Sequence, residues 1–575
     1  MKKIILSVLL FSISLLSFAQ QYFGTNTFGN TNIETNYDVA KDSQGNVYSV
    51  GFYSGTLTVG TTTVTYKGGN ADGYLAKHDA NGNPLWVKSF GGAADDVALA
   101  VTVDNADNIL ITGYFQGAGS NSFDADPGPN VYPLSQLAPI LSRDCFIVKL
   151  DSNGDFIWAK QVSNPAGGAA NEDSKDITVD SSNNIYVVGG FNYADFDPGA
   201  GQQTILATGG GNNQDGFVLK LDSNGDYVWV KTFNSSSAVV IESIDIDTAD
   251  NLLIAGRYQG IVDLDPSTTV TANSSTSNGS FDNFLVKLDA TGNYVWGKVF
   301  GGSGFDNPTF VETTGTDVYI GGSLVGNQDL DPSTGTNMYT VLGSSDGYIS
   351  KFDSSGNYVS SYVVGGSTTT ENEEMYRMIV GPNGNLFVTG TFLDTADFDF
   401  GTTTVNTTSN GGLDVYILEL TPSMQYVNHI TVGGTGREIF PKIVFNADNS
   451  LLFSGSFISS TVDFNPYSGI DTINNSATNT YDVFVSRFEW ANIALPTNSF
   501  HQNAVGIYPN PVKDIVNISN NESFTSYKIY NTLGQIVKQG SLNGETIDLS
   551  TISNGIYSLQ LSGNNINQTK KIIKE

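Results

Sequence analysis

Apolar and polar residues alternate in short runs along most of the chain, and this period of two is typical of β-strands. In residues 217–221, for example, the first, third and fifth side chains are Phe or Leu and share one face. A turn containing Gly225 follows, and then a second run of the same kind over residues 227–233. The pair of strands recurs at intervals of roughly 70 residues, which indicates one repeated supersecondary unit. Its copies lie around Lys77, Lys149, Lys220, Lys287, Lys351, Glu419 and Arg487.

Four strands are predicted in each repeat. In the third repeat they cover residues 177–180, 184–189, 217–221 and 227–233. A glycine closes the second strand of every repeat, and we expect neighbouring units to approach closely there. The seven glycines, which predict seven units, are Gly51, Gly113, Gly189, Gly256, Gly322, Gly390 and Gly455.

The two ends of the repeated region complement each other. Residues 21–29 form a lone strand with no repeat before it, whereas the last repeat ends at Trp490 without a fourth strand. Pairing the two would close a ring and remove the exposed sheet edge of an open array. The predicted fold is therefore all-β, with a seven-bladed β-propeller over residues 21–490 that is closed by the N-terminal strand.

The repeat unit resembles a known family. Segments of the form D-x-x-G-N-x-Y-x-x-G, followed by D-x-F-V-x-K-L-D-x-x-G-N-x-x-W-x-K-x-F-G-G, are similar to the SBBP-type β-propeller repeats of exported proteins from Bacteroidetes-like bacteria. The resemblance covers about residues 21–490 and is clearest in the first four units. In the fifth and sixth units Ser360 and Asn428 replace the tryptophan. The resemblance implies a fold and leaves the activity undefined.

The amino end has the pattern of a secretory signal peptide. Lys2 and Lys3 precede an apolar stretch at residues 4–16, and Ser17-Phe18-Ala19 forms a small-x-small cleavage site within residues 1–20. The apolar stretch is too short to span a bilayer, and no later segment reaches that length. We therefore expect an exported protein without a transmembrane anchor.

The last part of the chain differs in character from the repeats. Residues 491–504 lack a strand period and are interpreted as a linker, whereas alternation in residues 505–575 predicts a small β-sandwich. This tail resembles the type A sorting domain of the type IX secretion system. The resemblance implies that the secretion machinery is a partner and that the protein is secreted, extracellular or at the outer-membrane surface. The matching positions are Tyr508, Pro509, Asn510, Pro511, Gly534, Asn554, Gly555, Tyr557, Lys570 and Lys571.

Charge and composition exclude several functions. The formal net charge of −31 argues against nucleic acid, which needs clustered Lys and Arg, and fits a soluble extracellular or cation-binding protein. Cys145 is the only cysteine, so no intrachain disulfide forms, and its apolar neighbours predict a buried filler. The three histidines have no zinc-ligand spacing.

Acidic pairs follow the second strand of six repeats. The two members lie two residues apart and therefore point to the same side, roughly 6.5–7 Å from each other along the chain. One hypothesis is a set of oxygen ligands for Ca²⁺. The alternative is a turn in which Asp accepts backbone N–H groups and the following Pro fixes the bend. The pairs are Asp124/Asp126, Asp195/Asp197, Asp263/Asp265, Asp329/Asp331, Asp397/Asp399 and Asp463/Asn465.

Repetition of these pairs argues against catalysis, because a catalytic pair should be singular and lie in a distinct pocket. We predict no enzyme activity, and a binding, adhesion or scaffold module for a glycan, a surface polymer or another protein. An enzyme acting on extracellular polysaccharide, a hydrolase or lyase, is the alternative, and a structural matrix protein is a third. The recurring tryptophans, Trp86, Trp158, Trp229 and Trp296, are interpreted as packing residues before sugar platforms.

Overall fold

The computed structural model describes residues 21–117, 122–136, 142–165, 170–208, 213–267, 274–366, 373–401, 404–467, 469–490, 506–519, 524–531, 535–542, 544, 546–563 and 566–575. The predicted signal peptide, the predicted linker and Gly534 lie outside these residues. Contacts divide the chain into two compact units, with the division after Ile493. No helix in the described part of the chain has the length and apolar character needed to cross a membrane.

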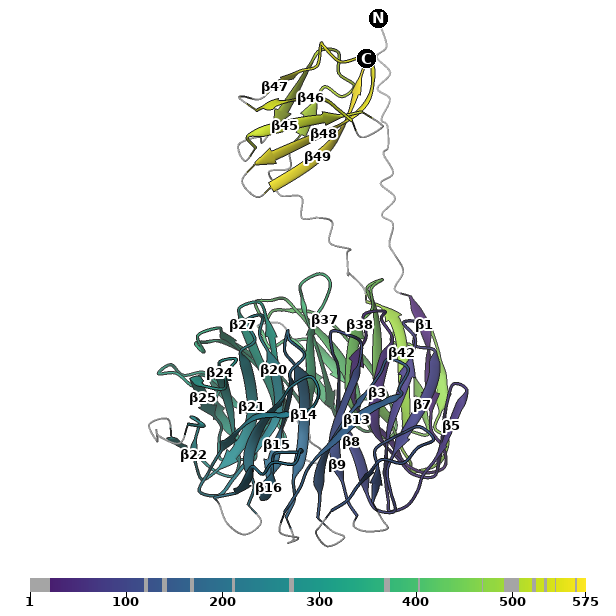
Figure 1. Cartoon of the computed structure of the whole chain (residues 1–575), viewed down its shortest axis with the longest axis vertical. Coiled ribbons are helices and arrows are strands. Elements are labelled where there is room, and N and C mark those ends of the chain that lie inside the picture. Colours follow the sequence, from purple (N-terminus) through teal and green to yellow (C-terminus); the bar gives the residue numbers. More distant parts are fainter. Residues whose placement is uncertain are drawn as a thin grey trace, which may run out of the picture. The chain divides into compact units, whose positions relative to one another are not determined.

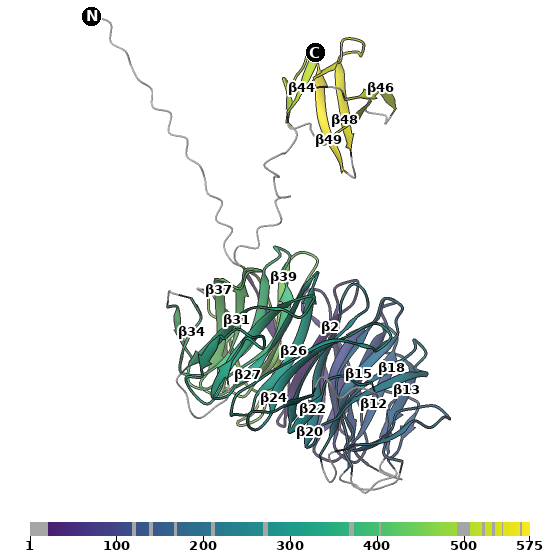
Figure 2. The same ribbon diagram turned by 90° about the vertical axis from the view of Figure 1, so that its left-hand side faces the viewer.

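Antiparallel sheets lie side by side in the first unit (Figures 1 and 2). In the described residues five of these sheets have four strands, and two have six because a connecting hairpin joins them. The innermost strands are β2 (Glu34–Lys41), β8 (Asp96–Val103), β14 (Asp173–Val179), β20 (Ala238–Ile246), β26 (Asn307–Thr314), β32 (Glu374–Val380) and β38 (Glu438–Phe445). The second strands are β3 (Val47–Tyr53), β9 (Ile109–Phe115), β15 (Ile185–Phe191), β21 (Leu252–Gln259), β27 (Asp317–Leu324), β33 (Leu386–Phe392) and β39 (Ser450–Phe457).

The third and fourth strands complete each sheet in chain order, except that the amino-terminal strand β1 is the fourth strand of the last sheet. The third strands are β6 (Asp72–His78), β12 (Asp144–Leu150), β18 (Asp215–Leu221), β24 (Asp282–Leu288), β30 (Asp346–Asp353), β36 (Asp414–Leu420) and β42 (Asp482–Glu489). The fourth strands are β7 (Pro84–Phe90), β13 (Phe156–Val162), β19 (Tyr227–Phe233), β25 (Tyr294–Phe300), β31 (Tyr358–Gly366), β37 (Tyr426–Gly434) and β1 (Tyr22–Phe28). The prediction of an all-β, propeller-like fold built from antiparallel sheets is confirmed.

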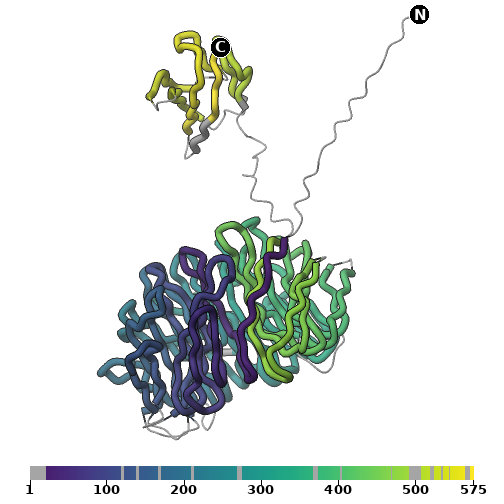
Figure 3. Tube along the Cα trace, turned by 90° about the vertical axis from the view of Figure 1, so that its right-hand side faces the viewer, coloured from purple at the N-terminus to yellow at the C-terminus, as the bar shows by residue number. Residues whose placement is uncertain are grey.

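The sheets contact one another in cyclic order. Each innermost strand contacts the next one, from β2 to β8 and onward to β38, and β38 contacts β2 again. The amino-terminal strand β1 pairs with β42, from Tyr22 opposite Phe488 to Phe28 opposite Val483 (Figure 3). Strands from the two ends of the repeated region therefore share one sheet.

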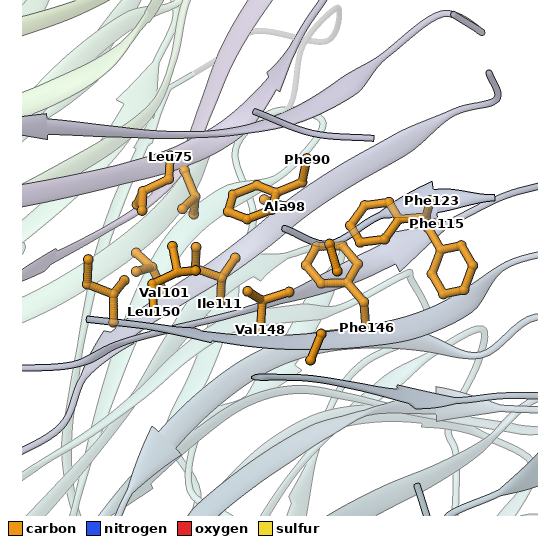
Figure 4. Close-up of a cluster of buried hydrophobic side chains, with 14 of the residues drawn as sticks. Leu75, Phe90, Ala98, Val101, Ile111, Phe115, Phe123, Phe146, Val148 and Leu150 are labelled. Carbon is orange, nitrogen blue, oxygen red and sulfur yellow. The ribbon is translucent and has the colours of Figure 1, made fainter. Parts of the chain in front are cut away.

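Apolar side chains fill the space between consecutive sheets. Figure 4 shows one such cluster, in which Leu75 and Phe90 of the first sheet face Val101, Ile111 and Phe146 of the second. These side chains come from the faces that the alternation predicts to be buried. Each sheet is therefore stabilised by its neighbours rather than by a core of its own.

Short hairpins, which the sequence did not reveal, connect the second and third strands. Two of them pair with the fourth strand of the preceding sheet, β34 with β31 and β40 with β37, so they fasten one sheet to the next. The hairpin strands are β4 (Thr56–Val59), β5 (Thr62–Thr65), β10 (Phe123–Asp124), β11 (Pro133–Leu134), β16 (Tyr193–Asp195), β17 (Thr204–Leu206), β22 (Ile261–Asp263), β23 (Ser274–Thr276), β28 (Asn327–Asp329), β29 (Met338–Thr340), β34 (Thr395–Asp397), β35 (Asn406–Thr408), β40 (Thr461–Asp463) and β41 (Thr472–Asn474).

The glycines that close the second strands do mark close approaches, but the expected partner was wrong. A Cβ atom on Gly113 would overlap the carbonyl oxygen of Val97, and one on Gly189 would overlap that of Asp173. Both partners belong to the innermost strand of the same sheet and not to a neighbouring sheet. The predicted packing role of the tryptophans is confirmed, since Trp86 lies against Gly154 in the turn between β12 and β13.

Acidic side chains form the joints between consecutive sheets. At the first joint, the Asp72 carboxylate accepts the Lys67 backbone N–H (2.7 Å) and lies against Gly91, where a Cβ atom would overlap it. Asp96 of the next sheet accepts the N–H of Gly92 (2.6 Å). Both acids are fully buried, and Oδ1 of Asp72 has no hydrogen-bond partner. The paired glycines after the fourth strand thus fit between two carboxyl groups.

The described residues of the second unit form seven strands in two sheets. One sheet has the order β43-β44-β47 and the other β46-β45-β48-β49. Val516, Ile529, Leu559 and Ile572 from the two sheets share one core, in agreement with the predicted β-sandwich. The strands are β43 (Gly506–Tyr508), β44 (Ile515–Ser519), β45 (Ser526–Tyr530), β46 (Ile536–Ser541), β47 (Thr546–Asp548), β48 (Gly555–Gly563) and β49 (Ile566–Lys574).

Candidate functional site

A register shift interrupts the pairing of the innermost strand in each of the seven sheets. In β2 it falls between Asn36 and Asp38, in β14 between Ser174 and Asp176, and in β32 between Met375 and Arg377. Strands β8, β20, β26 and β38 have the same interruption. An extra residue of this kind bends the strand and redirects side chains. Here the bulges turn polar side chains toward the centre of the cyclic array.

These side chains surround a cavity of about 280 Å³. All of the innermost strands contribute to its lining, which is rich in charged and aromatic groups. They include Tyr37, Asp38, Lys175, Asp176, Glu242, Asp245, Glu312, Tyr376, Arg377 and Lys442. A concave site at the meeting point of several elements, with convergent polar groups, is the usual location of a ligand.

Arg377 is the central charge of this cavity. Its Nη1 lies 3.0 Å from Oδ1 of Asp38, and its Nε lies 3.9 Å from Oε1 of Glu312. Burial by itself lowers the pKa of Arg377, but the surrounding carboxylates, Asp38 first among them, raise it overall. Arg377 therefore remains charged and connects the sixth sheet with the first and the fifth.

Backbone donors hold the other carboxylates in place. Asp176 accepts the Ile244 N–H (3.0 Å) and the Ser243 hydroxyl (2.9 Å) from the next sheet, and Asp245 accepts the Thr313 N–H (2.7 Å) in the same manner. Each carboxylate thus has one fixed orientation before any ligand arrives. Such preorganisation lowers the entropic cost of binding.

Carboxyl groups in the cavity differ in their proton affinity. Burial, together with the charge of Asp245, raises the pKa of Glu312 to about 8, and burial raises the pKa of Asp176 to about 6. At neutral pH Glu312 is therefore largely protonated and can donate a hydrogen bond, whereas Asp176 only accepts. The cavity consequently offers both donors and acceptors to a ligand.

Aromatic and cationic side chains gather where the innermost strands begin, and we call this end of the cavity the mouth. Phe440 contacts Tyr37 and Tyr376, with ring centroids 5.0 and 5.7 Å away. The guanidinium of Arg143 lies 4.1 Å from the ring of Tyr114, and that of Arg257 lies 5.2 Å from Phe305. Flat apolar faces and planar charged groups thus alternate around the mouth.

Sequence reasoning missed both the cavity and its mouth. A signal was nevertheless present, because several of the innermost strands contain charged residues. Examples are Asp176 in DSKDITV, Glu312 in NPTFVETT and Arg377 in EMYRMIV. A charge in such a strand needs a polar partner, and facing strands can supply one.

The predicted acidic pairs lie in the connecting hairpins, away from the cavity. In the third sheet, Oδ1 of Asp195 accepts the N–H groups of Asp197 (3.2 Å) and Gln203 (2.8 Å), and Asp197 accepts that of Gly199 (2.8 Å). The side chain between them, Phe196, is fully buried. Acceptance of backbone N–H groups recurs at Asp124, Asp126, Asp263, Asp265, Asp329, Asp331, Asp397, Asp399 and Asp463.

These contacts favour the turn interpretation of the pairs. In the part of the chain that the structure describes, no group of three or more His, Cys, Asp or Glu side chains comes together as a metal site. The Ca²⁺ hypothesis stays a prediction, in which each pair would act with backbone or solvent oxygens.

Two substitutions separate the interpretations. Asn keeps the acceptor oxygen, so Asp195→Asn is expected to change the free energy of unfolding by less than about 1 kcal/mol, whereas Asp195→Ala should cost about 1–2 kcal/mol. Urea unfolding of the full-length protein with calcium and with a chelator provides the measurement. A calcium-dependent stabilisation that both variants lose would instead support the metal site.

Five of the ten sorting-motif residues lie on strands: Tyr508 on β43, Gly555 and Tyr557 on β48, and Lys570 and Lys571 on β49. Asn510 accepts the Ile573 N–H through Oδ1 (2.8 Å) and donates to the carbonyl oxygen of Lys571 through Nδ2 (2.8 Å). The Tyr-Pro-Asn-Pro segment is thereby bound to the last strand, which also carries Lys570. Asn554 and Gly555 precede Tyr557, whose hydroxyl donates to the carbonyl oxygen of Ser553 (2.7 Å).

Comparison with known proteins gives one family and several weak likenesses. An uncharacterized WD repeat-containing protein of Acanthamoeba polyphaga mimivirus is 29% identical over 185 residues, which is 28% of this chain and only 13% of that protein. A protein of unknown function from Dyadobacter fermentans is 11% identical, with 82% of this chain and 99% of the other covered and a TM-score of 0.34. PorZ, a surface component of the type IX secretion system of Porphyromonas gingivalis, is 12% identical, with 94% and 81% covered and a TM-score of 0.20. Structural likenesses this weak carry no argument about function.

The comparison with family models identifies the carboxyl-terminal domain. Residues 506–575 match the model of the secretion system C-terminal sorting domain. This match confirms the resemblance of the tail and implies an interaction with the type IX secretion system. The chain therefore carries a sorting domain that identifies it as a secreted or outer-membrane surface protein.

Proposed function

We propose that this protein is a surface or secreted binding protein, exported through the type IX system, whose seven sheets form an SBBP-type β-propeller closed by β1. Its central cavity would bind a polar ligand such as a glycan, a surface polymer or a segment of another protein. The role is binding and not catalysis, since the cavity carboxylates are held by backbone N–H groups and by Arg377.

The observation that carries this proposal is the convergence of charges from separate sheets. Asp38, Asp176, Asp245, Glu312, Arg377 and Lys442 come from six different innermost strands and line one cavity. Burial of so many charged groups costs stability unless they are paired or used. A role in binding accounts for the retention of these ionisable groups at the cavity.

A cavity-filling variant tests the proposal. The full-length protein is first screened on a glycan array, and Thr178→Trp is then compared with the unchanged protein on every ligand found. Thr178 lines the cavity, so the indole should occupy it and abolish binding, whereas Thr58→Trp on the exposed face of β4 should bind normally. Equal binding by both variants would place the site elsewhere.

An enzyme acting on polysaccharide is the second candidate. Glu312, with a pKa of about 8, and Asp176, with a pKa of about 6, are two carboxyl groups of unequal acidity in one cavity. Such inequality is typical of an acid and a base that act together. Loss of polysaccharide cleavage in Glu312→Gln, with binding retained, would favour this candidate.

A further inference from the structure

The distribution of arginine in the chain is uneven. The sequence contains five arginines among 26 basic residues, and four of the five lie in the cavity or at its mouth. Arg377 lines the cavity, Arg257 pairs with the lining residue Glu242, and the charge of Arg437 acts on Tyr376. Arg487, the fifth, pairs with Asp448 in the seventh sheet. Lysine serves almost everywhere else in this acidic protein.

Arginine offers a geometry that lysine lacks. Its planar guanidinium carries five N–H donors in a rigid fork that matches the two oxygens of a carboxylate. At an ordinary surface pair lysine would serve equally well, as it does between Lys160 and Asp226. The concentration of arginine at one end of one cavity therefore indicates recognition of a planar, acceptor-rich group.

Neighbouring side chains fix the orientation of the guanidinium group of Arg257. Arg257 Nη1 lies 2.6 Å from Oε1 of Glu242 and also bonds to Asn307, while the rings of Phe281 and Phe305 lie 5.6 and 5.2 Å from its guanidinium. These contacts engage Nη1 and the flat faces, which leaves the donors on Nη2 for another acceptor.

Arg143 is held in a similar way. Its guanidinium stacks on Tyr114 at 4.1 Å, and its Nη1 lies 3.4 Å from Oδ1 of Asp173. The Arg143 side chain is 39% exposed, so a ligand can approach it from solvent. Arg143 and Arg257 belong to the second and fourth sheets, and the cavity lies between the innermost strands of these sheets.

The rest of the mouth offers surfaces of two other kinds. Tyr37, Tyr376 and Phe440 form a contiguous aromatic group, and each of them is partly exposed. Asp173 and Glu242 supply acceptors beside the arginines. An acidic sugar has a partner for each of these groups. Its carboxylate can pair with a guanidinium, its hydroxyl groups can donate to a carboxylate, and its C–H face can pack on an aromatic ring.

We infer that the mouth binds a carboxylated saccharide, such as a segment of a polymer that contains uronic acid. This inference rests on the proposed binding function and specifies its ligand. Carboxylates of the polymer pair with the guanidinium groups of Arg143 and Arg257, hydroxyl groups of its sugars donate to Asp173 and Glu242, and sugar rings stack on the aromatic group.

A matched pair of ligands tests the inference. Oligogalacturonate and the same oligosaccharide with its carboxyl groups methyl-esterified are titrated calorimetrically into the full-length protein. The acid form should bind and the ester should bind roughly 10- to 100-fold more weakly, because the hydrogen bonds to a charged group are lost. Equal affinity for the two forms would overturn the inference and leave the proposed saccharide binding intact. If neither form binds, the inference is overturned. The proposed binding function fails only if the glycan array also shows no ligand.

Substitutions at the mouth provide the second test. Arg143→Gln and Arg257→Gln should each weaken binding of oligogalacturonate by roughly 10- to 100-fold, with little change in binding of the ester. The control is Lys160→Met, which removes the same charge from an exposed pair on the fourth strand of the second sheet. Arg257 is more enclosed than Arg143, so Arg257→Gln is the variant more at risk of misfolding. If it does not fold, the affinity of Arg143→Gln alone decides the test. Unchanged affinity of Arg143→Gln would contradict the assignment.

Discussion

Raising the pH from about 6.5 to about 9 is expected to lower the melting temperature of the protein. The cause lies in the joints between sheets, where buried carboxyl groups have raised pKa values. Burial, with Asp144 nearby, raises the pKa of Glu172 to about 9, and burial raises that of Glu34 to about 8 and that of Asp72 to about 7. Similar joints contain Asp144, Glu373, Asp414 and Glu438.

The sign follows from proton binding in the two states. In the unfolded chain these acids ionise near pH 4, so at pH 6.5 and above only the folded chain retains their protons. As the pH rises toward the folded-state pKa, the folded chain must ionise a buried group or lose structure, and the free energy of unfolding falls. Glu172 alone should contribute about 3 kcal/mol over this interval.

Two histidines change the stability in the opposite direction, but they do so at a lower pH. Burial lowers the pKa of His78 and of His429 to about 4, so they stabilise the fold as the pH rises from about 4 to about 6.5 and have no effect above it. The two histidines therefore do not contribute to the change in stability above pH 6.5.

Melting followed by circular dichroism at several pH values provides the measurement. In Glu172→Gln the amide oxygen can still accept the Tyr193 N–H (3.2 Å), but the group no longer titrates, so its profile should be flatter than that of the unchanged protein. The matched comparison is Glu489→Gln, which changes an exposed acid. A melting temperature that stays constant or rises across the interval would show that the joints contain no retained protons.

The substitution Lys149→Met is expected to destabilise the protein by about 3–5 kcal/mol. Nζ of Lys149 lies 2.9 Å from Oδ2 of Asp104, and the two side chains are 8% and 1% exposed. Lys149 also donates to the carbonyl oxygen of Ser223 in the next sheet (3.2 Å). Methionine conserves the apolar stem but leaves a buried carboxylate without its cation, which explains the size of the effect.

Lys160→Met is the control for this result. Lys160 lies 3.4 Å from Asp226, whose side chain is 72% exposed, so its loss should cost less than about 1 kcal/mol. Urea unfolding of both variants gives the comparison, and adding Asp104→Asn to Lys149→Met should recover part of the lost stability. Similar costs for the two single substitutions would mean that burial adds nothing to the first pair.

Local patterns in the sequence predicted much of the fold. Alternation identifies strands such as residues 217–221, because a sheet buries every second side chain. The spare strand at residues 21–29 and the missing one after Trp490 predicted the pairing of β1 with β42. These features depend only on neighbouring residues or on counting repeats, and both can be read from one chain.

The cavity could not be read in the same way. A bulge shifts the alternation by one residue, so a strict period of two does not say which side chains of β2 face inward beyond Asn36. Which charges meet also depends on the cyclic arrangement, since Arg377 reaches Asp38 from a position 339 residues later in the chain. The acidic pairs can be recognised in the sequence because they repeat, whereas the cavity residues differ from sheet to sheet and form no repeated pattern.

Compensating changes are visible where one sheet departs from the repeat. Glu419 occupies the position of Lys149 in the sixth sheet, so the buried charge is reversed. Asn383 and Asn385 donate to its carboxylate (2.9 and 2.7 Å), and Trp490 donates through Nε1 (2.6 Å). The position thus requires a satisfied buried ion and not a particular sign of charge.

Closure by β1 also has a consequence for the order of assembly. Residues 22–28 are synthesised early, yet their partners at residues 483–488 are synthesised more than four hundred residues later. Until then the first strand has no edge to join, and the earlier sheets can stack only as an open stack with two unprotected faces. The final pairing closes a very long loop, which is an entropically costly and slow event. Pairing of β1 with β42 is therefore a late step, and it requires the entire repeated region to be present.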